Sequence, residues 1–525
     1  MKTVGERLVE GLAARGVTVV FGIPGVHTVE LYRGLSGSGV RHVTARQEQG
    51  AACMADGYAR VSGKPGVAFV ITGPGLTNAL TAMGQARADS VPMLVISGVN
   101  RRDSLGKGMG RLHELPDQAA MVRALCPTRQ ISGPADVGPS LDWAFARMTG
   151  GRPGPVHLEV PTDVMPLPCP ELALAVAVAA PALPDAALMT AAVARLNAAR
   201  RVVILAGGGA RKAEATLRAL AERLDAPVIQ TVNARGQMHL HGLCVAASPS
   251  LASARALIAA ADQVLAVGTE MGQTDYDMYG DGGFPALPGM IRIDVDPDQL
   301  ARHPAAVALC GDAGAVMAAL LPRLTRHEGD GAERAEVARG ASRLVLGTLS
   351  AAMPGQLEMV EAIRSAMPGA IIVGDSTQPV YAANLYYAHD RAGGWFNAAT
   401  GFGTLGYGLG AAVGASLAAP GVKVVCLVGD GGLQFSPGEL RTAVDEHLPI
   451  SFVVWNNAGF REIADAMRAA KTEVIGCSPS PLRLEPFAAA CDLPFTSVPQ
   501  EAEVLHWALS QPCDGPRLIE VRVTL

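Results

Sequence analysis

The stretch that decides the fold is VKVVCLVGDGG (422–432), an apolar run that ends in a loop of one aspartate among three glycines. A second apolar run, ISFVVWNNAG (450–459), ends in two asparagines, the second of them 27 residues after Asp430. One strand, a helix over 437–446 and a returning parallel strand need about this length. Parallel strands bring the loops at their carboxyl ends to one edge of a sheet. We therefore expect Asp430 and Asn457 on the same edge of a parallel sheet.

Short apolar runs that alternate with amphipathic segments continue along the whole chain, the pattern of parallel sheets covered by helices. The predicted fold class is α/β, with three consecutive doubly wound parallel-sheet domains at residues 1–165, 186–325 and 346–525. Two segments interrupt the alternation. The Ala- and Pro-rich residues 166–185 and the charged, glycine-punctuated residues 326–343 are predicted to be linkers.

Composition narrows the class of protein. The 525 residues include 43 basic and 48 acidic side chains, a net charge of -5 that argues against a nucleic-acid partner. The nine cysteines are scattered and contain no Cys-x-x-Cys pair, so neither a disulfide framework nor a zinc site is expected. The N-terminal residues have a helical period and not the apolar core of a signal peptide. No unbroken run of about 20 apolar residues occurs, so we expect a cytoplasmic protein without a membrane partner.

The two C-terminal loops carry ligands that suit a hard metal ion. The Asp430 carboxylate, the Asn457 amide oxygen and the Gly459 carbonyl supply oxygen atoms, which Mg²⁺ prefers together with water and phosphate oxygens. The glycines around Asp430 let the backbone approach phosphates, and the following helix offers its N-terminus to an anion. A Gly-Asp-Gly sequence alone is as well explained by a tight turn. The second loop, with its two asparagines, favours the metal site.

The sequence Gly429-Asp430-Gly431, the intervening helix and Asn456-Asn457 resemble the thiamine diphosphate motif of the acetolactate synthase and 2-oxo acid decarboxylase superfamily. This resemblance implies that the three domains are, in order, pyrimidine-binding, central and diphosphate-binding. It also implies thiamine diphosphate and Mg²⁺ as cofactors, with the metal on Asp430, Asn457 and the Gly459 carbonyl. Further landmarks of the pyrimidine-binding domain occur in order as FGIPG (21–25), RQEQGAA (46–52), DGYA (56–59), GPG (73–75) with Asn78, and GPV (154–156).

Glu48 is in the position of the superfamily's glutamate. A thiamine cofactor forms an ylid at C2, and a carboxylate hydrogen-bonded to the aminopyrimidine favours the imino form that removes the C2 proton. An isolated glutamate is usually solvated at a helix start, but the small residues 50–52 are unlike an exposed helix face. Leu405 matches the apolar residue that props the cofactor in its bent conformation, a role compatible with ordinary core packing.

The resemblance implies a set of cofactor-binding residues from both ends of the chain. They are Gly25, Glu48, Pro74, Asn78, Ser376, Thr377, Gln378, Gly403, Thr404, Leu405, Gly429, Asp430, Gly431, Gly432, Asn457, Gly459 and Phe460.

Other positions are expected to decide which reaction follows. His113 matches a polar position that faces the cofactor, and Gln118 follows it on the same helical stretch, so we predict both as catalytic residues with Glu48. A lone histidine is equally well explained by a structural role. Val26, next to His27, stands where pyruvate and benzoylformate decarboxylases have Asp or Ser. We expect Val26, His27 and His113 to line the substrate pocket.

The loop after the metal site lacks the tryptophan of anabolic acetolactate synthases and carries Glu462 and Asp465 instead. Carboxylates in the pocket repel the substrate's own carboxylate unless the substrate also has a distal cation. The chain further resembles the 5-guanidino-2-oxopentanoate decarboxylases. We therefore predict thiamine diphosphate- and Mg²⁺-dependent decarboxylation of a 2-oxo acid through ylid and enamine, giving an aldehyde with a guanidino side chain. The alternative is an acetolactate synthase-like carboligase, in which the enamine attacks a second carbonyl.

Relatives of this kind differ in their central domain and assembly. Acetolactate synthases hold a non-redox FAD in the central domain, whereas many decarboxylases hold none. For this chain we favour a central domain without FAD. The triple glycine at 207–209 could be a weak dinucleotide loop, but such a sequence is usually a turn. The expected partners are a small 2-oxo acid and a second copy of the chain. In the superfamily the cofactor lies between two subunits, which predicts a homodimer or a dimer of dimers. A non-catalytic scaffold and a nicotinamide oxidoreductase are the rival classes.

Overall fold

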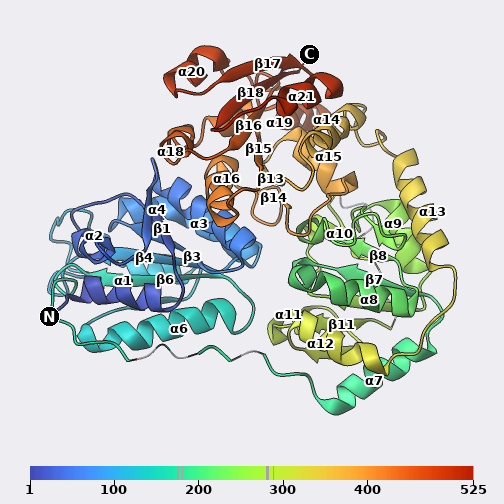
Figure 1. Cartoon of the computed structure of the whole chain (residues 1–525), viewed down its shortest axis with the longest axis horizontal. Coiled ribbons are helices and arrows are strands. Elements are labelled where there is room, and N and C mark those ends of the chain that lie inside the picture. The colour runs from blue at the N-terminus through green and yellow to red at the C-terminus, as the bar shows by residue number, and fades with distance from the viewer. Residues whose placement is uncertain are drawn as a thin grey trace.

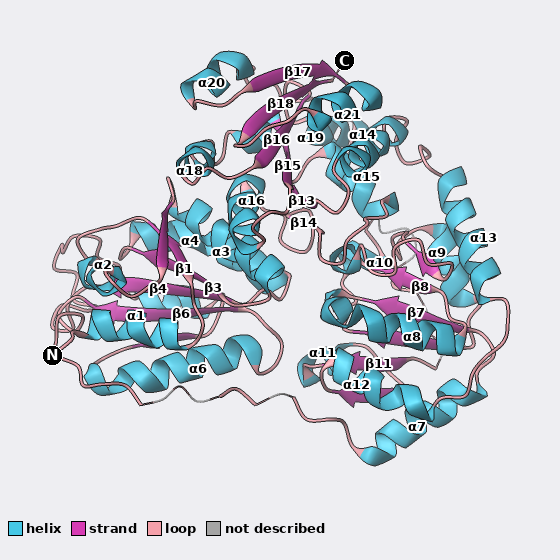
Figure 2. Ribbon diagram, in the orientation of Figure 1, coloured by secondary structure: helices cyan, strands magenta, loops and turns pink. Residues whose placement is uncertain are grey.

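The computed structural model describes residues 1–523 except 174, 176, 180, 279–282, 286 and 288. It contains three six-stranded sheets, each with parallel strand pairs and helices on its faces, so the predicted fold class is confirmed. Figures 1 and 2 show three lobes, with the N-terminal and central sheets side by side and the C-terminal sheet above them. The three sheets fall within the three predicted domains, whose limits stay a prediction.

The N-terminal domain has the strand order β2-β1-β3-β4-β6-β5. Its apolar strands are buried on both faces because helices cover both sides of the sheet. Its elements are α1 (Val4–Ala14), β1 (Val19–Gly22), α2 (Val29–Leu35), β2 (Arg41–Thr44), α3 (Glu48–Ser62), β3 (Gly66–Val70), α4 (Pro74–Ala88), β4 (Met93–Val99), α5 (Gln118–Arg123), β5 (Thr128–Gln130), α6 (Val137–Thr149) and β6 (Pro155–Pro161).

The central domain has a different order, β12-β11-β10-β7-β8-β9, which changes direction beside its first strand. The chain reaches it through residues 166–185, whose described members after Pro170 form neither helix nor strand, in agreement with the predicted linker. Its elements are α7 (Ala186–Ala198), β7 (Val202–Ala206), α8 (Glu214–Leu224), β8 (Val228–Gln230), β9 (Cys244–Val245), α9 (Ala252–Ala259), β10 (Gln263–Val267), α10 (Gln273–Tyr276), β11 (Ile291–Asp294), α11 (Pro297–Arg302), β12 (Val307–Cys310) and α12 (Ala313–Leu320).

The prediction of a second linker at residues 326–343 is wrong for most of its length. Helix α13 (Gly331–Leu344) occupies it. One face of α13 is small and buried, through Ala335 and Ala338, and the Ser342 and Ser253 hydroxyls lie 2.6 Å apart where α13 meets α9. Glu333, Glu336 and Arg343 are exposed on its outer face, whereas Arg334 bonds back to the Val202 carbonyl oxygen.

The C-terminal domain repeats the N-terminal topology, with the order β14-β13-β15-β16-β18-β17. Strands β15 and β16 are neighbours and pair from Val424 with Ile450 to Gly429 with Trp455, so their loops leave the same edge, as predicted. Its elements are α14 (Met353–Ala366), β13 (Ile371–Gly374), α15 (Gln378–Tyr386), β14 (Trp395–Asn397), α16 (Tyr407–Ala418), β15 (Val424–Gly429), α17 (Asp430–Leu433), α18 (Glu439–Asp445), β16 (Ile450–Asn456), α19 (Arg461–Ala469), α20 (Leu484–Ala490), β17 (Phe495–Pro499), α21 (Ala502–Ser510) and β18 (Arg517–Arg522).

Helices α3 and α16 join the two outer domains and lie against each other in Figure 1. Their backbones approach closely because both carry glycine at the contact. A Cβ atom on Gly57 would lie 2.0 Å from the Ala411 carbonyl oxygen, and one on Gly414 would lie 1.9 Å from the Met54 carbonyl oxygen. One buried apolar cluster therefore runs from the N-terminal sheet to the C-terminal sheet. In the part of the chain that is described, no helix has the length and apolar character needed to cross a membrane.

Candidate functional site

Asp430, Asn457 and Gly459 meet at the carboxyl ends of β15 and β16, as predicted. Asp430 begins α17 directly after β15, and both its side chain and that of Asn457 are buried. One terminal atom of the Asn457 amide lies 2.7 Å from the Gly459 carbonyl oxygen and 3.2 Å from Oδ1 of Asp430, and an N–H group at this end would donate to both. Desolvation raises the pKa of Asp430, against nearby backbone N–H groups that lower it. The Asn457 amide thus lies next to a carboxylate and a backbone carbonyl, and with its oxygen turned inward the three groups could hold a metal ion as an oxygen cluster.

Glycine is required at two points of this edge. Gly459 has φ +149°, and a Cβ atom there would lie 2.4 Å from the Cys477 carbonyl oxygen. A Cβ on Gly431 would lie 2.6 Å from the ring of Phe460, which covers this turn. The predicted residues Gly431, Gly459 and Phe460 therefore pack together around the oxygen cluster.

The predicted segment Ser376, Thr377 and Gln378 follows β13 on the same edge and leads into α15. The Gln378 amide oxygen accepts hydrogen bonds from Asn457 Nδ2 (2.9 Å) and from the Trp455 indole (3.4 Å). Gln378 thereby contacts the Asn457 amide on the side away from Asp430 and Gly459. Thr377 Oγ1 would lie 3.0 Å from a Cβ on Gly429, so this hydroxyl contacts the loop before Asp430.

Asp375, which directly precedes Ser376 in the same predicted diphosphate-contacting segment, is fully buried. Its carboxylate accepts backbone N–H bonds from Ser376 (2.8 Å), Gly406 (3.3 Å) and Gly408 (2.8 Å). Desolvation raises the pKa of Asp375 to about 6, although these backbone donors favour its charged form. Asp375 thus connects the sheet edge that follows β13 to the loop that carries Leu405.

Glu48 lies at the start of α3 in the N-terminal domain. Gln47 caps this helix, because its side-chain oxygen accepts from the N–H groups of Gln49 (2.6 Å) and Gly50 (3.2 Å). Asn78 Nδ2 donates to Glu48 Oε2 at 2.9 Å. Pro74 opens α4, the helix that carries Asn78. The structure therefore brings together the predicted residues Glu48, Pro74 and Asn78.

The loop with Gly403, Thr404 and Leu405 lies next to this helix end. Gln49 Nε2 donates to the Leu405 carbonyl oxygen at 3.2 Å, and Gly403 has a positive φ of +80°. Within one chain, the start of α3 therefore contacts the loop that carries Leu405. The prediction that a second subunit completes the site stays a prediction.

His27 and His113 lie edge to face, with ring centroids 5.4 Å apart. Burial, together with the proximity of His113, lowers the pKa of His27. Gly25, two residues before His27, packs against Ile71, whose Cδ1 would lie 2.5 Å from a Cβ at that position. Val26 is 69% exposed. The predicted substrate-side residues Val26, His27 and His113 thus lie near Gly25 at one end of the N-terminal sheet.

The structure does not favour a direct catalytic role for Gln118. Its side chain is buried, its Oε1 accepts from Gly73 N–H (3.0 Å), and its Nε2 donates to the Gly98 carbonyl oxygen (2.9 Å), Ser97 Oγ (3.1 Å) and Glu159 Oε2 (3.2 Å). A side chain that uses its whole amide in this way has no group left for a substrate. Gln118 instead stabilises the backbone turn at Gly73, just before Pro74.

Glu462 and Asp465 are three residues apart on α19 and have different surroundings. The Glu462 pKa is raised by partial desolvation and by the Asp465 charge, against a hydrogen bond with Gln378. Asp465 has a side chain 61% exposed and forms an ion pair with Arg468. Of the two predicted pocket carboxylates, Glu462 adjoins the oxygen cluster through Gln378, whereas Asp465 points to solvent.

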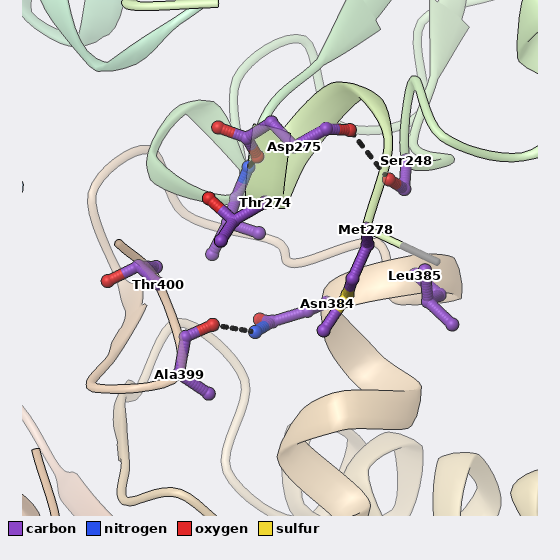
Figure 3. Close-up of a pocket in the computed structure, with 9 residues that line it drawn as sticks. Ser248, Thr274, Asp275, Met278, Asn384, Leu385, Ala399 and Thr400 are labelled. Carbon is purple, nitrogen blue, oxygen red and sulfur yellow. Dashed lines mark hydrogen bonds between the residues drawn. The ribbon is translucent and has the colours of Figure 1, made fainter. Parts of the chain in front are cut away.

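The glycines at the end of β7 are explained by packing. A Cβ on Gly207 would lie 2.3 Å from the Gly268 carbonyl oxygen, and one on Gly209 would lie 2.8 Å from Gly268 Cα. A separate small pocket lies between the central and C-terminal domains and is lined by Asp275, Ser248, Thr400 and neighbours (Figure 3). Burial raises the pKa of Asp275 to about 6. This pocket is distinct from the cluster around Asp430.

Sequence reasoning missed two contacts that cross between the outer domains. Glu439 on α18 accepts backbone N–H bonds from Arg46 and Gln47, just before Glu48. Gln85 on α4 accepts the N–H of Thr404, just before Leu405. In the sequence, Glu439 and Gln85 are visible only as polar residues among apolar helix positions. Such a pattern is common and does not indicate a contact with a distant domain.

Family models match all three domains of the chain. The N-terminal thiamine pyrophosphate-binding domain of thiamine pyrophosphate enzymes matches residues 2–121, their central domain matches 189–320, and their C-terminal thiamine pyrophosphate-binding domain matches 375–521. An enzyme from Mycobacterium smegmatis assigned as thiamin diphosphate-dependent has an X-ray structure similar to this chain, with a TM-score of 0.83, 24% identity and full coverage of both chains. At this identity the structural likeness supports the fold.

Two curated relatives are similar over nearly the whole chain. The probable 2-ketoarginine decarboxylase AruI of Pseudomonas aeruginosa is 45% identical over 487 residues, which cover 91% of this chain and 86% of the relative. The large subunit of acetolactate synthase isozyme 1 of Escherichia coli is 30% identical over 547 residues, which cover 99% and 94%. These matches, with the residues that the structure brings together at its two sheet edges, show that the chain belongs to the thiamine pyrophosphate enzyme family.

Proposed function

We propose that this chain is a thiamine diphosphate- and Mg²⁺-dependent decarboxylase of a 2-oxo acid with a distal guanidino group, which it converts into CO₂ and an aldehyde. The observation that carries the proposal is the 45% identity to a 2-ketoarginine decarboxylase over 91% of the chain, combined with Glu462 beside the oxygen cluster. Thiamine diphosphate, when bound, supplies a nucleophilic carbon and an electron sink for the loss of CO₂.

The oxygen cluster supports Mg²⁺ as the metal. An octahedral Mg²⁺ holds oxygens at about 2.0–2.1 Å, which places neighbouring ligand oxygens about 3 Å apart. The inner terminal atom of the Asn457 amide is 2.7 and 3.2 Å from its two oxygen neighbours, close to that spacing. Without an ion, an amide N–H at this position would donate to both oxygens, and a bound cation would turn the amide oxygen of Asn457 toward them instead. Asp430, Asn457 and Gly459 would hold this ion, and Thr377 and Gln378 lie on the same edge.

The N-terminal edge would hold the organic part of the cofactor. Glu48 is the carboxyl group expected to share a proton with N1′ of the aminopyrimidine, which favours the imino form, and Asn78 orients it by donating to Oε2. Leu405, on the loop that Gln49 holds, would support the bent cofactor. His27 and His113 are candidates for orienting the substrate carboxylate or relaying a proton, and burial disfavours a charged His27.

Glu462 is the candidate for recognising the distal cation. Glu462 is exposed at the start of α19, contacts Gln378, and has a pKa raised by partial desolvation and by the Asp465 charge. A guanidinium supplies a planar pair of donors that fits such a carboxylate. An apolar 2-oxo acid such as pyruvate would leave the carboxylate unpaired, which disfavours it.

The second candidate function is an acetolactate synthase-like carboligation. The 30% identity to an acetolactate synthase over 99% of the chain favours it. The two functions share the cofactor and differ in whether a proton or a second carbonyl compound is taken up after CO₂ leaves.

We also infer self-association. Val26, Phe402, Phe435 and Ile463 belong to the segments of the site and are each more than half exposed. An apolar rim of this kind suits burial by a second copy of the chain. Sedimentation showing a fully active monomer at assay concentration would refute this inference.

The test compares 5-guanidino-2-oxopentanoate with pyruvate, following CO₂ release and acetolactate formation with and without thiamine diphosphate and Mg²⁺. The expected result is a higher specificity constant for the guanidino acid, cofactor-dependent CO₂ release and an aldehyde product. A higher specificity constant for pyruvate with accumulation of acetolactate would replace the decarboxylase by the carboligase.

A further inference from the structure

The two outer domains place Glu48 and Leu405 at corresponding points of one topology. In the N-terminal sheet, edge strand β2 leads into α3, which begins at Glu48. In the C-terminal sheet, edge strand β14 leads into α16, which begins at Tyr407, two residues after Leu405. These two helices pack against each other, so the segments in front of them lie side by side. Gln49 Nε2 bridges them through its bond to the Leu405 carbonyl oxygen.

Glu439 reaches the segment in front of Glu48 from the opposite domain. Its Oε1 accepts the N–H groups of Arg46 and Gln47, each at 3.1 Å, and its Oε2 accepts from Thr442 Oγ1 at 2.7 Å. The side chain is fully buried. A Cβ on Gly50 would lie 2.1 Å from Glu439 Oε1, so the glycine gives the carboxylate access to the start of α3.

Gln85 makes the corresponding contact in the other direction. It lies on α4, the helix that follows β3, as α18 with Glu439 follows β15 and α17. Its Oε1 accepts the Thr404 N–H at 3.2 Å, and its Nε2 donates to Asp89 Oδ2 (2.7 Å) and Thr400 Oγ1 (3.1 Å). Thr400 Oγ1 in turn donates to Asp89 Oδ2 at 2.9 Å. Both ends of the loop before Leu405 are therefore attached to the N-terminal domain.

We propose that Glu439 and Gln85 are positioning residues, each of which fixes from the opposite domain the backbone that carries one cofactor-facing side chain: Glu439 for Glu48, and Gln85 for Leu405. The roles of Glu48 and Leu405 rest on the proposed function. A carboxylate at Glu439 can only accept, which matches the two N–H groups that face it. A displacement of about 1 Å at either segment is enough to lower the rate strongly.

A purely structural role would hold the two domains together without affecting these segments in particular. The chain offers a matched control for that role. Glu446, one residue beyond α18, forms an ion pair with Arg41 across the same pair of domains. Replacing Glu446 removes a cross-domain contact but leaves the backbone before Glu48 untouched.

The experiment measures amide hydrogen exchange of the full chain without cofactor, and then cofactor affinity and kinetics of the loaded enzyme, for Glu439→Gln, Gln85→Met and the control Glu446→Gln. In Glu439→Gln an amide group can donate where the carboxylate could only accept. We expect exchange at residues 46–50 to become about tenfold faster, and kcat to fall about ten- to a hundredfold with little change in substrate KM.

In Gln85→Met we expect faster exchange at residues 403–406 and cofactor binding about tenfold weaker. Glu446→Gln should match the wild type.

The proposal is overturned if amide exchange at residues 46–50 has the same rate in Glu439→Gln as in the Glu446→Gln control. It is also overturned if Glu439→Gln and Gln85→Met both accelerate exchange in the same segments. If Glu439→Gln fails to fold, Thr442→Val removes one donor to the same carboxylate and must give a smaller change in the same segment. Exchange without cofactor does not depend on the reaction. A wild type that fails to bind thiamine diphosphate would refute the proposed function instead, whatever the exchange shows.

Discussion

The N-terminal and C-terminal sheets share one strand order and have different chemistry at the corresponding edge. Strand β15 ends in Gly429-Asp430-Gly431, whereas its counterpart β3 ends before Ile71-Thr72-Gly73. Two buried carboxylates with raised pKa, Asp375 and Asp430, follow strands of the C-terminal sheet. No carboxylate directly follows β1 or β3 of the N-terminal sheet. Its functional carboxylate, Glu48, comes from the helix after edge strand β2.

This difference shows that two domains of the same topology can bind chemically different parts of one ligand. An edge with buried acids and strand-end glycines suits a metal ion and phosphates. An edge lined by Gly, Pro and small apolar residues suits an aromatic ring, with a single carboxylate to one side. The topology fixes where a ligand can bind, and the loop residues decide which part of it binds there.

The largest expected effect tests the charged edge, because an enzyme that cannot bind its cofactor loses every later step of the reaction. Asp430→Ala removes the anionic member of the oxygen cluster, so thiamine diphosphate in the presence of Mg²⁺ should bind at least about a hundredfold more weakly, roughly 3 kcal/mol. Titration calorimetry measures this, with Asp514→Ala, an exposed aspartate of the same domain, as the control. Wild-type affinity in Asp430→Ala would sink the assignment of this edge.

The next test addresses the other edge. Glu48→Gln keeps the shape and the contact with Asn78 but loses the base, so the cofactor should still bind while exchange of its C2 proton slows by about 10²- to 10⁴-fold. NMR of the bound cofactor follows this exchange. An unchanged rate would take Glu48 out of the chemistry and leave the N-terminal edge a binding surface only.

A third test measures whether the buried carboxyl group of Asp375 lowers the free energy of unfolding as the pH rises. The pKa of Asp375 is about 6 in the folded chain against about 4 unfolded. A raised folded pKa gives stability that is present below pH 4 and is lost as pH rises to 6, by up to about 3 kcal/mol. Denaturant midpoints of the cofactor-free protein between pH 4 and 7 should fall more in the wild type than in Asp375→Asn. Parallel profiles would contradict the prediction.

The smallest expected effect concerns the substrate. Glu462→Gln should lower the specificity constant for 5-guanidino-2-oxopentanoate about ten- to a hundredfold, since a charged hydrogen bond contributes about 1.5–3 kcal/mol. Asp465→Asn is the matched control, because that carboxylate is exposed and paired with Arg468, and should change little. Equal losses in both variants would mean that the charge of α19 as a whole, and not Glu462 itself, attracts the substrate.

Much of the fold and the metal cluster could be predicted because their signals are local. Strand ends, glycines and the spacing from Asp430 to Asn457 all lie within about 40 residues of sequence. The helix α13 was missed because its charged face outweighed the small buried stripe at Ala335 and Ala338. A catalytic role for Gln118 stays a prediction, and a sequence pattern does not reveal that its amide bonds to the backbone of Gly73 and Gly98.

The cross-domain contacts could not be predicted for a physical reason. Glu439 and Gln47 are separated by 392 residues, and Gln49 and Leu405 by 356. No period or spacing in a single sequence relates positions so far apart. A glutamate on a helix is solvated far more often than it is a cap for a distant helix.

These sequence separations also set the order of events during synthesis. A ribosome adds about 5–20 residues per second, so helix α3 waits on the order of 20–80 s before α16 emerges. Until then the buried small face of α3, around Met54 and Gly57, has no partner from the C-terminal domain. Contacts of such range form late and slowly. The cofactor site is therefore among the last parts of the molecule to assemble, and chains truncated before residue 400 would expose this apolar helix face and be prone to aggregation.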